Sequence, residues 1–226
     1  MMASPIACPT TGTYATLEAL SGTGDGCLIN GLLFNDFTFT PSATGTGLVP
    51  TAAQVAYTLD NPGTSTGTGQ LIYGFEFNPN VSVVGIGSED LLLNYTIIAP
   101  SAEITSIHML ENATTFGAAT ALVAEGPDRA CTGVGTGCVF LPIIEATPTA
   151  PHQDLLGLGP FTEIDVIKDI NVTSSATNGI AAISQVRDAV DITTSTTVPE
   201  PLGYAYALGG LGLLALGRFR NKRRRS

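Results

Sequence analysis

"GQLIYGFEFNPN", residues 69–80, is the stretch that decides the fold class. Tyr73, Phe75 and Phe77 alternate with small or polar residues, and a period of two is the spacing of side chains on one face of a β-strand. The glycine before this run and the Asn-Pro-Asn after it have the composition of turns. The stretch therefore predicts a strand with an aromatic face directed into a core.

The same period recurs in neighbouring stretches. "NGLLFNDFTFT" and "AAQVAYTLDN" both place apolar residues at alternate positions, as expected of half-buried strands. The residues concerned are Phe37 and Phe39 in the first stretch and Val55, Tyr57 and Leu59 in the second. Residues 103–112 and 161–175 follow the pattern more loosely. "LLLNYTIIAP", residues 91–100, is nearly continuously apolar, which predicts a strand covered on both faces.

Turn compositions such as "PSATGTG" and "SSATNG" separate these runs. Many short strands divided by turns predict an all-β chain, here a two-sheet β-sandwich of eight to ten strands over residues 1–190. The jelly-roll and immunoglobulin-like topologies both remain open. No helix is expected before the C-terminal segment.

The four cysteines, Cys8, Cys27, Cys131 and Cys138, form two local pairs. Neither spacing fits the short intervals between the paired cysteines of a zinc site. Four cysteines allow three disulfide connectivities, and we predict Cys8–Cys27 and Cys131–Cys138 because "CTGVGTGC" is a glycine-rich loop that can close on itself. Disulfides persist in oxidising compartments, so the pattern favours an exported protein.

Charge divides the chain into two parts. Residues 1–200 contain three basic residues against all 19 acidic ones. The last nine positions hold the other six basic residues: Arg218, Arg220, Lys222, Arg223, Arg224 and Arg225. Such an acidic body would repel a phosphate backbone, so no nucleic-acid partner is expected.

A helix that inserts into a membrane is predicted before this basic cluster. Leu202–Gly217 is uncharged and rich in Leu, Gly and Ala, with Tyr204 and Tyr206 at one end. Interfacial aromatics at one end and basic residues at the other are typical of a membrane span. The positive-inside rule leaves residues 218–226 in the cytoplasm and the sandwich outside. Residues 191–201 form the linker between them.

Val198, Pro199, Glu200 and Pro201 stand directly before this helix. Two prolines around one glutamate keep the segment extended, because proline lacks an N–H and restricts the residue before it. The order of Pro-Glu-Pro, short apolar helix and Arg-rich end resembles the PEP-CTERM sorting signal of Gram-negative bacteria. The resemblance covers residues 198–226 and implies export, with exosortase, an integral-membrane enzyme, as the partner that recognises the motif. It also implies an inner-membrane anchor before processing, and association with exopolysaccharide and biofilm at the cell surface or in the extracellular matrix.

The beginning of the chain departs from this pattern. "MMASPIACPTTG" has neither a basic start nor an apolar stretch, although the resemblance implies a secretory signal peptide. We therefore expect that the true start lies upstream of Met1.

Nucleophilic catalysis has few candidate residues. Gly63-Thr64-Ser65-Thr66-Gly67 matches G-x-S-x-G, but that motif requires a strand-to-helix turn, and here another predicted strand follows. His108 and His152 are the two possible bases, and Asp154 can orient His152. No convincing nucleophile accompanies them in the sequence, so no catalytic residue is assigned.

No metal or cofactor is expected. Neither histidine belongs to a recognisable metal-ligand cluster, and the glycine-rich segments fit no nucleotide fingerprint. Acidic residues near one another in the sequence raise calcium as an alternative without an EF-hand pattern. They are Asp154, Glu163, Asp165 and Asp169, with Glu89 and Asp90 as a separate pair.

Three functions remain open. The first is a non-enzymatic exported surface or matrix protein. The second is a carbohydrate-binding module for exopolysaccharide, although the chain has no Trp and only six Tyr to stack on sugars. The third is a secreted hydrolase, which lacks a catalytic triad in the sequence.

Overall fold

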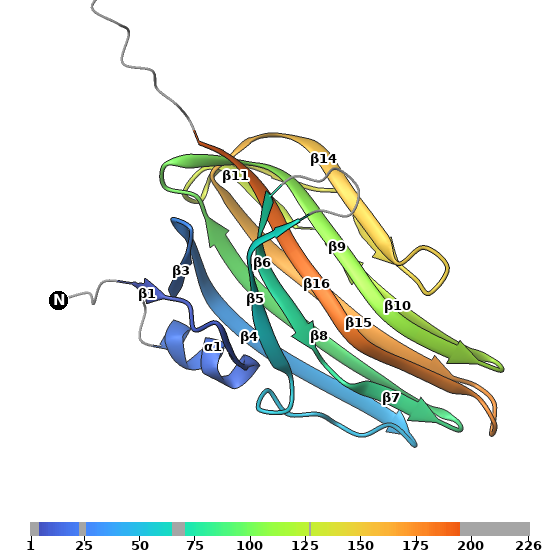
Figure 1. The fold of residues 1–226 in the computed structure, drawn as a ribbon. Coiled ribbons are helices and arrows are strands. Elements are labelled where there is room, and N and C mark those ends of the chain that lie inside the picture. The colour runs from blue at the N-terminus through green and yellow to red at the C-terminus, as the bar shows by residue number, and fades with distance from the viewer. Residues whose placement is uncertain (1–4, 23–25, 65–70, 127, 195–226) are drawn as a thin grey trace, which may run out of the picture. The chain divides into compact units, whose positions relative to one another are not determined.

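The computed structural model describes residues 5–22, 26–64, 71–126 and 128–194. The chain divides into two units, Met1–Thr194 and Ser195–Ser226, and every described residue belongs to the first. In that unit two β-sheets pack face to face (Figure 1). The predicted all-β two-sheet sandwich is therefore confirmed.

Sheet A has nine strands in the described region, in the order β1-β3-β4-β8-β15-β10-β13, with β11 paired to β15 and to β12. Their bounds are β1 Ile6–Ala7, β3 Cys27–Ile29, β4 Leu32–Gly45, β8 Gly87–Ile98, β10 Ala119–Glu125, β11 Arg129–Gly133, β12 Thr136–Phe140, β13 Ile144–Ala146 and β15 Glu163–Ser174.

Sheet B has seven strands in the described region, in the order β14-β9-β16-β6-β5-β2, with β7 paired to β16. Their bounds are β2 Thr11–Thr13, β5 Ala56–Thr64, β6 Leu71–Asn78, β7 Val81–Val84, β9 Ala102–Phe116, β14 His152–Phe161 and β16 Ile180–Thr194. The prediction of eight to ten strands is too low, because the short edge strands are too brief to show a period of two.

Alternation along the strands builds the core between the sheets. Phe75 and Phe77 of β6 are fully buried, as their spacing predicts. The expectation that residues 91–100 are covered on both faces is wrong. Strand β8 alternates strictly between buried and half-buried positions, and the residues of its inward row are Leu91, Leu93, Tyr95 and Ile97. Its apolar character comes from a central position between β4 and β15 rather than from a second covering layer.

A β-bulge in β4 changes which side chains face the core. Phe34 and Phe37 are both buried, although strict alternation would put residues three apart on opposite faces. The pairing with β8 shifts between Asn35 and Thr38, and Asp36 adopts a left-handed backbone conformation with φ 56°. The extra residue brings Phe37 back to the inward side.

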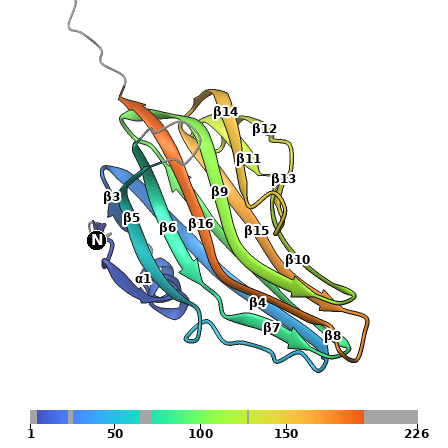
Figure 2. The same ribbon diagram turned by 45° about the vertical axis from the view of Figure 1, so that its right-hand side comes forward.

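The sequence did not predict helix α1, Tyr14–Gly22. Tyr14 and Leu17, one turn apart, are fully buried, and the Tyr14 hydroxyl donates hydrogen bonds to the carbonyls of Thr38 and Asn94 at 3.1 and 2.9 Å. The Tyr14 ring also contacts three phenylalanines of the core, namely Phe37, Phe39 and Phe77. The helix lies beside β4 and β5, where it covers one side of the sandwich (Figure 2). It is too short and too weakly amphipathic to be recognised by periodicity.

Both predicted disulfides are confirmed. Cys8 is bonded to Cys27 and Cys131 to Cys138, and these are all four cysteines of the chain. Cys131 and Cys138 are direct partners across the β11–β12 hairpin.

The predicted membrane helix at residues 202–217, the sorting motif at 198–201 and the basic cluster at 218–226 lie outside the described residues. Among the described residues, no helix has the length and apolarity needed to cross a membrane.

Candidate functional site

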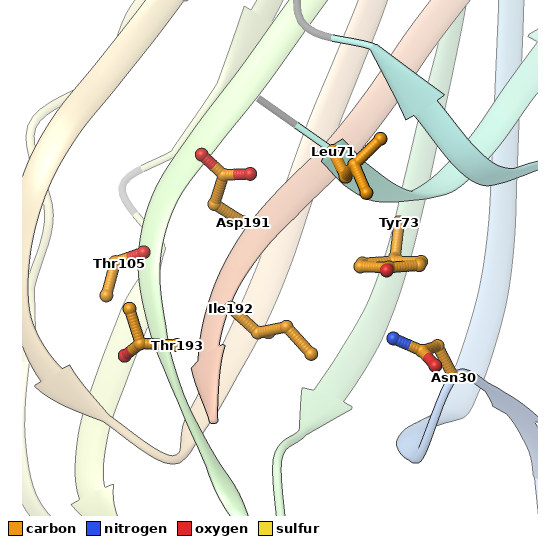
Figure 3. A pocket seen from close by; sticks show the side chains of 7 residues that line it. All are labelled: Asn30, Leu71, Tyr73, Thr105, Asp191, Ile192 and Thr193. Atoms are coloured by element: carbon orange, nitrogen blue, oxygen red, sulfur yellow. The ribbon is translucent and has the colours of Figure 1, made fainter. Parts of the chain in front are cut away.

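A pocket with a volume of about 310 Å³ opens at one end of the sandwich (Figure 3). Its walls come from the β3–β4 turn of sheet A and from strands β6, β9 and β16 of sheet B. The lining residues are Asn30, Leu71, Tyr73, Thr105, Asp191, Ile192 and Thr193. The lining thus includes one tyrosine, one aspartate, one asparagine and two threonines.

A tight turn positions Asn30 at the pocket. Asn30 and Gly31 connect β3 to β4 with φ values of 49° and 84°, as in the Asn-Gly turns that join two antiparallel strands. The sequence predicted Tyr73 as a core residue, and the structure leaves it half-buried. Tyr73 lies in phase with Phe75 and Phe77 on β6 and lines the pocket.

Asp191 is held in place by side chains of β9. It is buried, and its Oδ2 accepts a hydrogen bond from the Ser106 hydroxyl at 2.9 Å. The same oxygen lies 3.3 Å from Nε2 of His108. Ser106 and Asp191 are direct cross-strand partners, so β9 and β16 set this contact.

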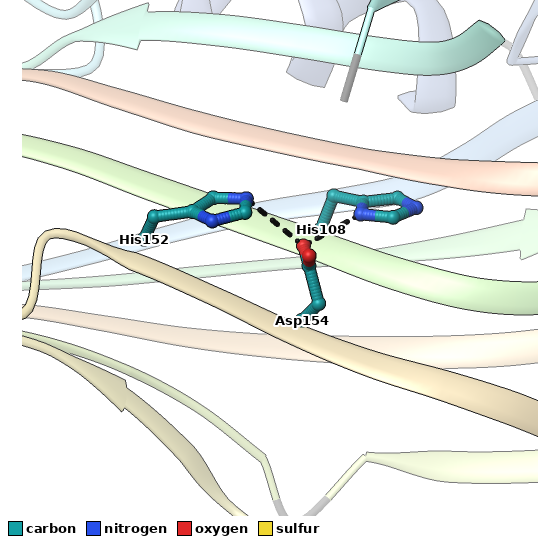
Figure 4. Close-up of side chains that lie close together, drawn as sticks. All are labelled: His108, His152 and Asp154. Atoms are coloured by element: carbon teal, nitrogen blue, oxygen red, sulfur yellow. Dashed lines mark hydrogen bonds and ion pairs between the residues drawn. The ribbon is translucent and has the colours of Figure 1, made fainter. Parts of the chain in front are cut away.

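A second carboxylate bonds to His108 from the other side. Asp154 Oδ1 is 2.6 Å from His108 Nδ1 and 3.0 Å from His152 Nε2 (Figure 4). Asp154 is the cross-strand partner of His108, which fixes this geometry. The prediction that Asp154 can orient His152 is confirmed, and Asp154 also orients His108. A chain of hydrogen bonds and ion-pair contacts therefore runs from the carboxylate of Asp191 through His108 and Asp154 to His152.

Ser106, His108 and Asp154 follow the order of a hydrolase triad. Ser106 Oγ lies 3.0 Å from His108 Nε2, and His108 Nδ1 contacts Asp154. However, Ser106 is only 3% exposed, does not line the described pocket and donates its hydroxyl to Asp191. The arrangement therefore orients Asp191 rather than presenting a nucleophile. Ser106 is not predicted from the sequence, although a Ser-x-His pair on one strand face is a usable signal.

The structure also forms a possible metal-ligand cluster that the sequence did not predict. It consists of His108, His152 and Asp154. The sequence showed no cluster, yet one ligand atom from each lies within 4.8 Å of the others. Two imidazoles and a carboxylate suit a transition metal such as zinc. Here both rings bond directly to one oxygen of Asp154. The 2.6 Å separation from His108 is shorter than the roughly 3.3 Å between two ligands of a tetrahedral zinc ion with bonds near 2 Å. The three residues are arranged to bond one another.

The structure separates the acidic residues considered for calcium. Glu163 and Asp165 lie in sheet A and pair with Arg129 at 3.4 and 2.6 Å, whereas Asp154 lies in sheet B. Asp169 contacts Asp90, and its burial together with this neighbour raises its pKa to about 7.

Two further candidates from the sequence are Glu89 and the G-x-S-x-G match. Glu89 accepts hydrogen bonds from the backbone N–H groups of Leu48 and Ser82, which gives it a structural role. In the G-x-S-x-G match, Gly63 and Thr64 belong to β5, and residues 65–67 lie outside the described residues.

No protein-family model and no curated protein matches the chain. Several solved structures show distant similarity. The enzymatically active domain of tailspike protein 4 from bacteriophage CBA120 is 15% identical over 69% of this chain and 19% of that chain, with a TM-score of 0.31. TmCBM61, solved in complex with β-1,4-galactotriose, is 10% identical over 68% of this chain and 88% of that chain, with a TM-score of 0.32.

The third structure comes from work on the promiscuous specificity of carbohydrate-binding modules of the β-sandwich superfamily. It is 12% identical over 70% of this chain and 56% of that chain, with a TM-score of 0.30. The chain thus spans about a fifth of the tailspike chain and about half of the third one. At these TM-scores and identities, the similarities carry no conclusion about ligand or activity.

Proposed function

We propose that this chain is a non-enzymatic, exported surface protein whose β-sandwich binds carbohydrate in the pocket at its end. The observation that carries the proposal is the residue content of the pocket, whose lining includes Tyr73, Asn30 and Asp191. A sugar presents C–H faces that pack on an aromatic ring and hydroxyls that bond to carboxylates and amides. Thr105 and Thr193 also line the pocket.

Preorganisation supports this role for Asp191. The hydrogen bond from Ser106 and the contact with His108 hold its carboxylate in one orientation. A group fixed before binding loses little conformational entropy when a ligand arrives. The same contacts occupy the Ser106 hydroxyl, which supports binding over hydrolysis.

Export and sorting are the second part of the proposal. The two disulfides suit an oxidising compartment, and residues 198–226 have the Pro-Glu-Pro, apolar and basic order of the PEP-CTERM signal. In this proposal exosortase recognises Pro199-Glu200-Pro201, and the chain is anchored in the inner membrane until it is processed. The exposed sandwich then meets exopolysaccharide at the cell surface.

We also propose the jelly-roll topology over the immunoglobulin-like one. The chain crosses from β8 in sheet A to β9 in sheet B and returns to β10 in sheet A. It crosses again between β15 in sheet A and β16 in sheet B. Chains that cross between the two sheets in this way are typical of jelly rolls, which also occur in lectin domains.

The binding proposal is tested with purified protein on an array of bacterial and plant polysaccharides. The wild type is expected to bind a defined set of glycans, and Tyr73→Ala is expected to lose that binding. Phe140→Ala is the matched control, because Phe140 is an aromatic residue 74% exposed on β12, outside the pocket. Absence of glycan binding, or equal binding by the Tyr73 variant, would overturn the proposal.

The sorting proposal is tested by the intact mass of protein recovered from the cell surface. Processed protein is expected to lack residues 202–226, and Glu200→Ala is expected to accumulate unprocessed in the inner membrane. Glu145→Ala, an exposed carboxylate on β13, serves as the control. Surface protein that still ends in Arg225-Ser226 would show that the tail is a plain anchor.

A further inference from the structure

Lys168 occupies an unusual place for a lysine. It lies in the middle of β15, between Val166 and Ile170 on the inward row, and its side chain is fully buried. Lysine is almost never fully buried unless it is paired, because removing an ammonium group from water is costly. Its partners therefore decide what this position does.

Three inward-facing residues from three other strands surround the Lys168 amine. Glu125 of β10 is the direct cross-strand partner of Lys168 and accepts a hydrogen bond from Nζ. Asp188 of β16 comes from the opposite sheet, with Oδ2 3.2 Å from Nζ. The Tyr95 hydroxyl donates a hydrogen bond to this same Oδ2. All four side chains are at most 2% exposed.

The carboxylates outnumber the amine in this dry site. Asp188 Oδ1 and Glu125 Oε1 are buried with no hydrogen-bond partner among the described residues. Burial, followed by the charge of Asp188, raises the pKa of Glu125 well above its ordinary value, which favours the protonated form of this carboxyl group. An ion pair alone leaves these two oxygens unsatisfied, which is a costly arrangement for buried polar atoms.

We propose that Lys168 and Asp188 condense to form an isopeptide bond that links β15 of sheet A to β16 of sheet B. Oδ2 of Asp188 lies 3.2 Å from Nζ, so the amine is in direct contact with the carboxyl group that it would attack. A lysine amine is a competent nucleophile once it is neutral and desolvated. The bond would be a self-modification within the core and needs no enzyme, metal or cofactor.

The reaction balances with the groups present. A proton passes from the Lys168 ammonium to Oδ1 of Asp188, which gives a neutral amine and a carboxylic acid in a site of low polarity. Nζ then forms a bond to Cγ of Asp188, and the C–O bond to Oδ1 breaks. Glu125 takes a proton from Nζ and delivers its own to Oδ1, which leaves as water. The products are one amide, one water molecule and an unchanged Glu125, with no oxidation or reduction.

Tyr95 and its surroundings support the same step. Its hydroxyl donates to Oδ2, the oxygen on which negative charge develops as Nζ attacks and which remains as the amide oxygen. The Tyr95 ring stacks on Phe37 with centroids 5.4 Å apart and meets Phe75 edge-on at 6.1 Å. These buried rings exclude water, so hydrolysis of the finished amide is disfavoured.

Mass spectrometry of the full-length folded protein tests the bond directly. The wild type is expected to weigh one water less than its sequence with two disulfides. Trypsin cannot cut after an acylated lysine, so residues 130–187 should stay joined to the peptide that begins at Asp188. Tandem fragmentation should place the link between Lys168 and Asp188. A mass that fits the two disulfides alone, with normal cleavage after Lys168, would show a simple ion pair and overturn the proposal.

Variants separate the roles of the residues. Lys168→Met and Asp188→Ala should both restore the lost water. Glu125→Gln keeps the side-chain volume but removes the proton relay, so the linked fraction should fall at least tenfold after a fixed incubation, whereas Glu145→Gln should leave it unchanged. If a core variant fails to fold, the mass and the peptide map of the wild type still decide whether the isopeptide bond forms. Full linkage in Glu125→Gln would remove Glu125 from the mechanism.

Discussion

His108 and Asp154 are direct cross-strand partners of β9 and β14, and their side chains meet at 2.6 Å. His108 is only 2% exposed and lies between the carboxylates of Asp154 and Asp191. The imidazole ring of His108 therefore contacts both carboxylates, one with each ring nitrogen.

His108→Ala is expected to destabilise the fold by about 3 kcal/mol, because each of the two carboxylates loses its contact with the buried ring and keeps only Ser106 or His152. His152→Ala is the matched control, since His152 is 28% exposed and contacts only the Asp154 side of the chain. It should cost less than about 1 kcal/mol. Urea unfolding with an unchanged slope measures both values. Equal effects of the two variants would contradict the role given to His108.

Glu111 predicts a pH dependence of stability. It lies on the inward row of β9 with Met109, and both its carboxylate oxygens are buried without a hydrogen-bond partner among the described residues. Burial raises its pKa from an ordinary value of 4.5 to about 7. The folded state thus binds the proton more tightly than the unfolded state. The stability from this group is fully present below about pH 4.5 and is lost as the pH rises through 7.

Glu111→Gln is therefore expected to stabilise the protein at pH 8 by about 2 kcal/mol and to have little effect at pH 4.5. Unfolding free energies of wild type and variant at a series of pH values test this. Glu145→Gln, at an exposed position, should leave the unfolding free energy as in the wild type at every pH. A variant less stable than the wild type at pH 8 would mean that the ionised carboxylate has a partner.

Tyr14→Phe tests how helix α1 is attached. The Tyr14 hydroxyl donates to the carbonyls of Thr38 in β4 and Asn94 in β8, so its removal leaves both acceptors without this donor. The expected loss is about 1–2 kcal/mol. Tyr73→Phe serves as the control, because Tyr73 is half-buried at the pocket. Hydrogen exchange should be faster in residues 14–22 of the Tyr14 variant, and unchanged protection there would contradict the prediction.

The disulfides should contribute unequally to stability. On the chain-entropy description, closing the longer loop between Cys8 and Cys27 contributes about 3 kcal/mol, and closing the shorter one between Cys131 and Cys138 about 2.5 kcal/mol. Paired Cys→Ala variants at each bond, compared by thermal unfolding, measure the two contributions. Protein recovered from its native compartment should contain no free thiol. Four free thiols would contradict export to an oxidising compartment.

The sequence predicted the parts of the fold that depend on local pattern. Alternation of Phe75 and Phe77 identifies β6 because both residues face one core, and the short glycine-rich loop between Cys131 and Cys138 favours their pairing. Helix α1 was missed because nine residues without a strong apolar stripe give little periodic signal. Strand β8 was read as doubly covered because Leu92 and Ile98 of its outward row extend the apolar run, although Asn94 and Thr96 in the same row are polar.

The site depends on contacts that local pattern does not contain. Asp154 and Asp191 are 46 and 83 residues from His108, and only the order β14-β9-β16 in sheet B brings them together. Lys168 carried a weaker signal. It falls in phase with Val166 and Ile170, so the period of two already placed it inward, but the partner in the opposite sheet follows only from the packing of the sandwich.

The position of β16 has a mechanical consequence. This strand is the last one described and lies inside sheet B, paired with β9 along nearly its whole length and with β6 and β7 on its other side. A pull on the chain beyond Thr194 would act along β16 and shear many hydrogen bonds at once, instead of opening them one by one as at a sheet edge. A domain tethered through its C-terminal side would in this way resist the drag of flowing water.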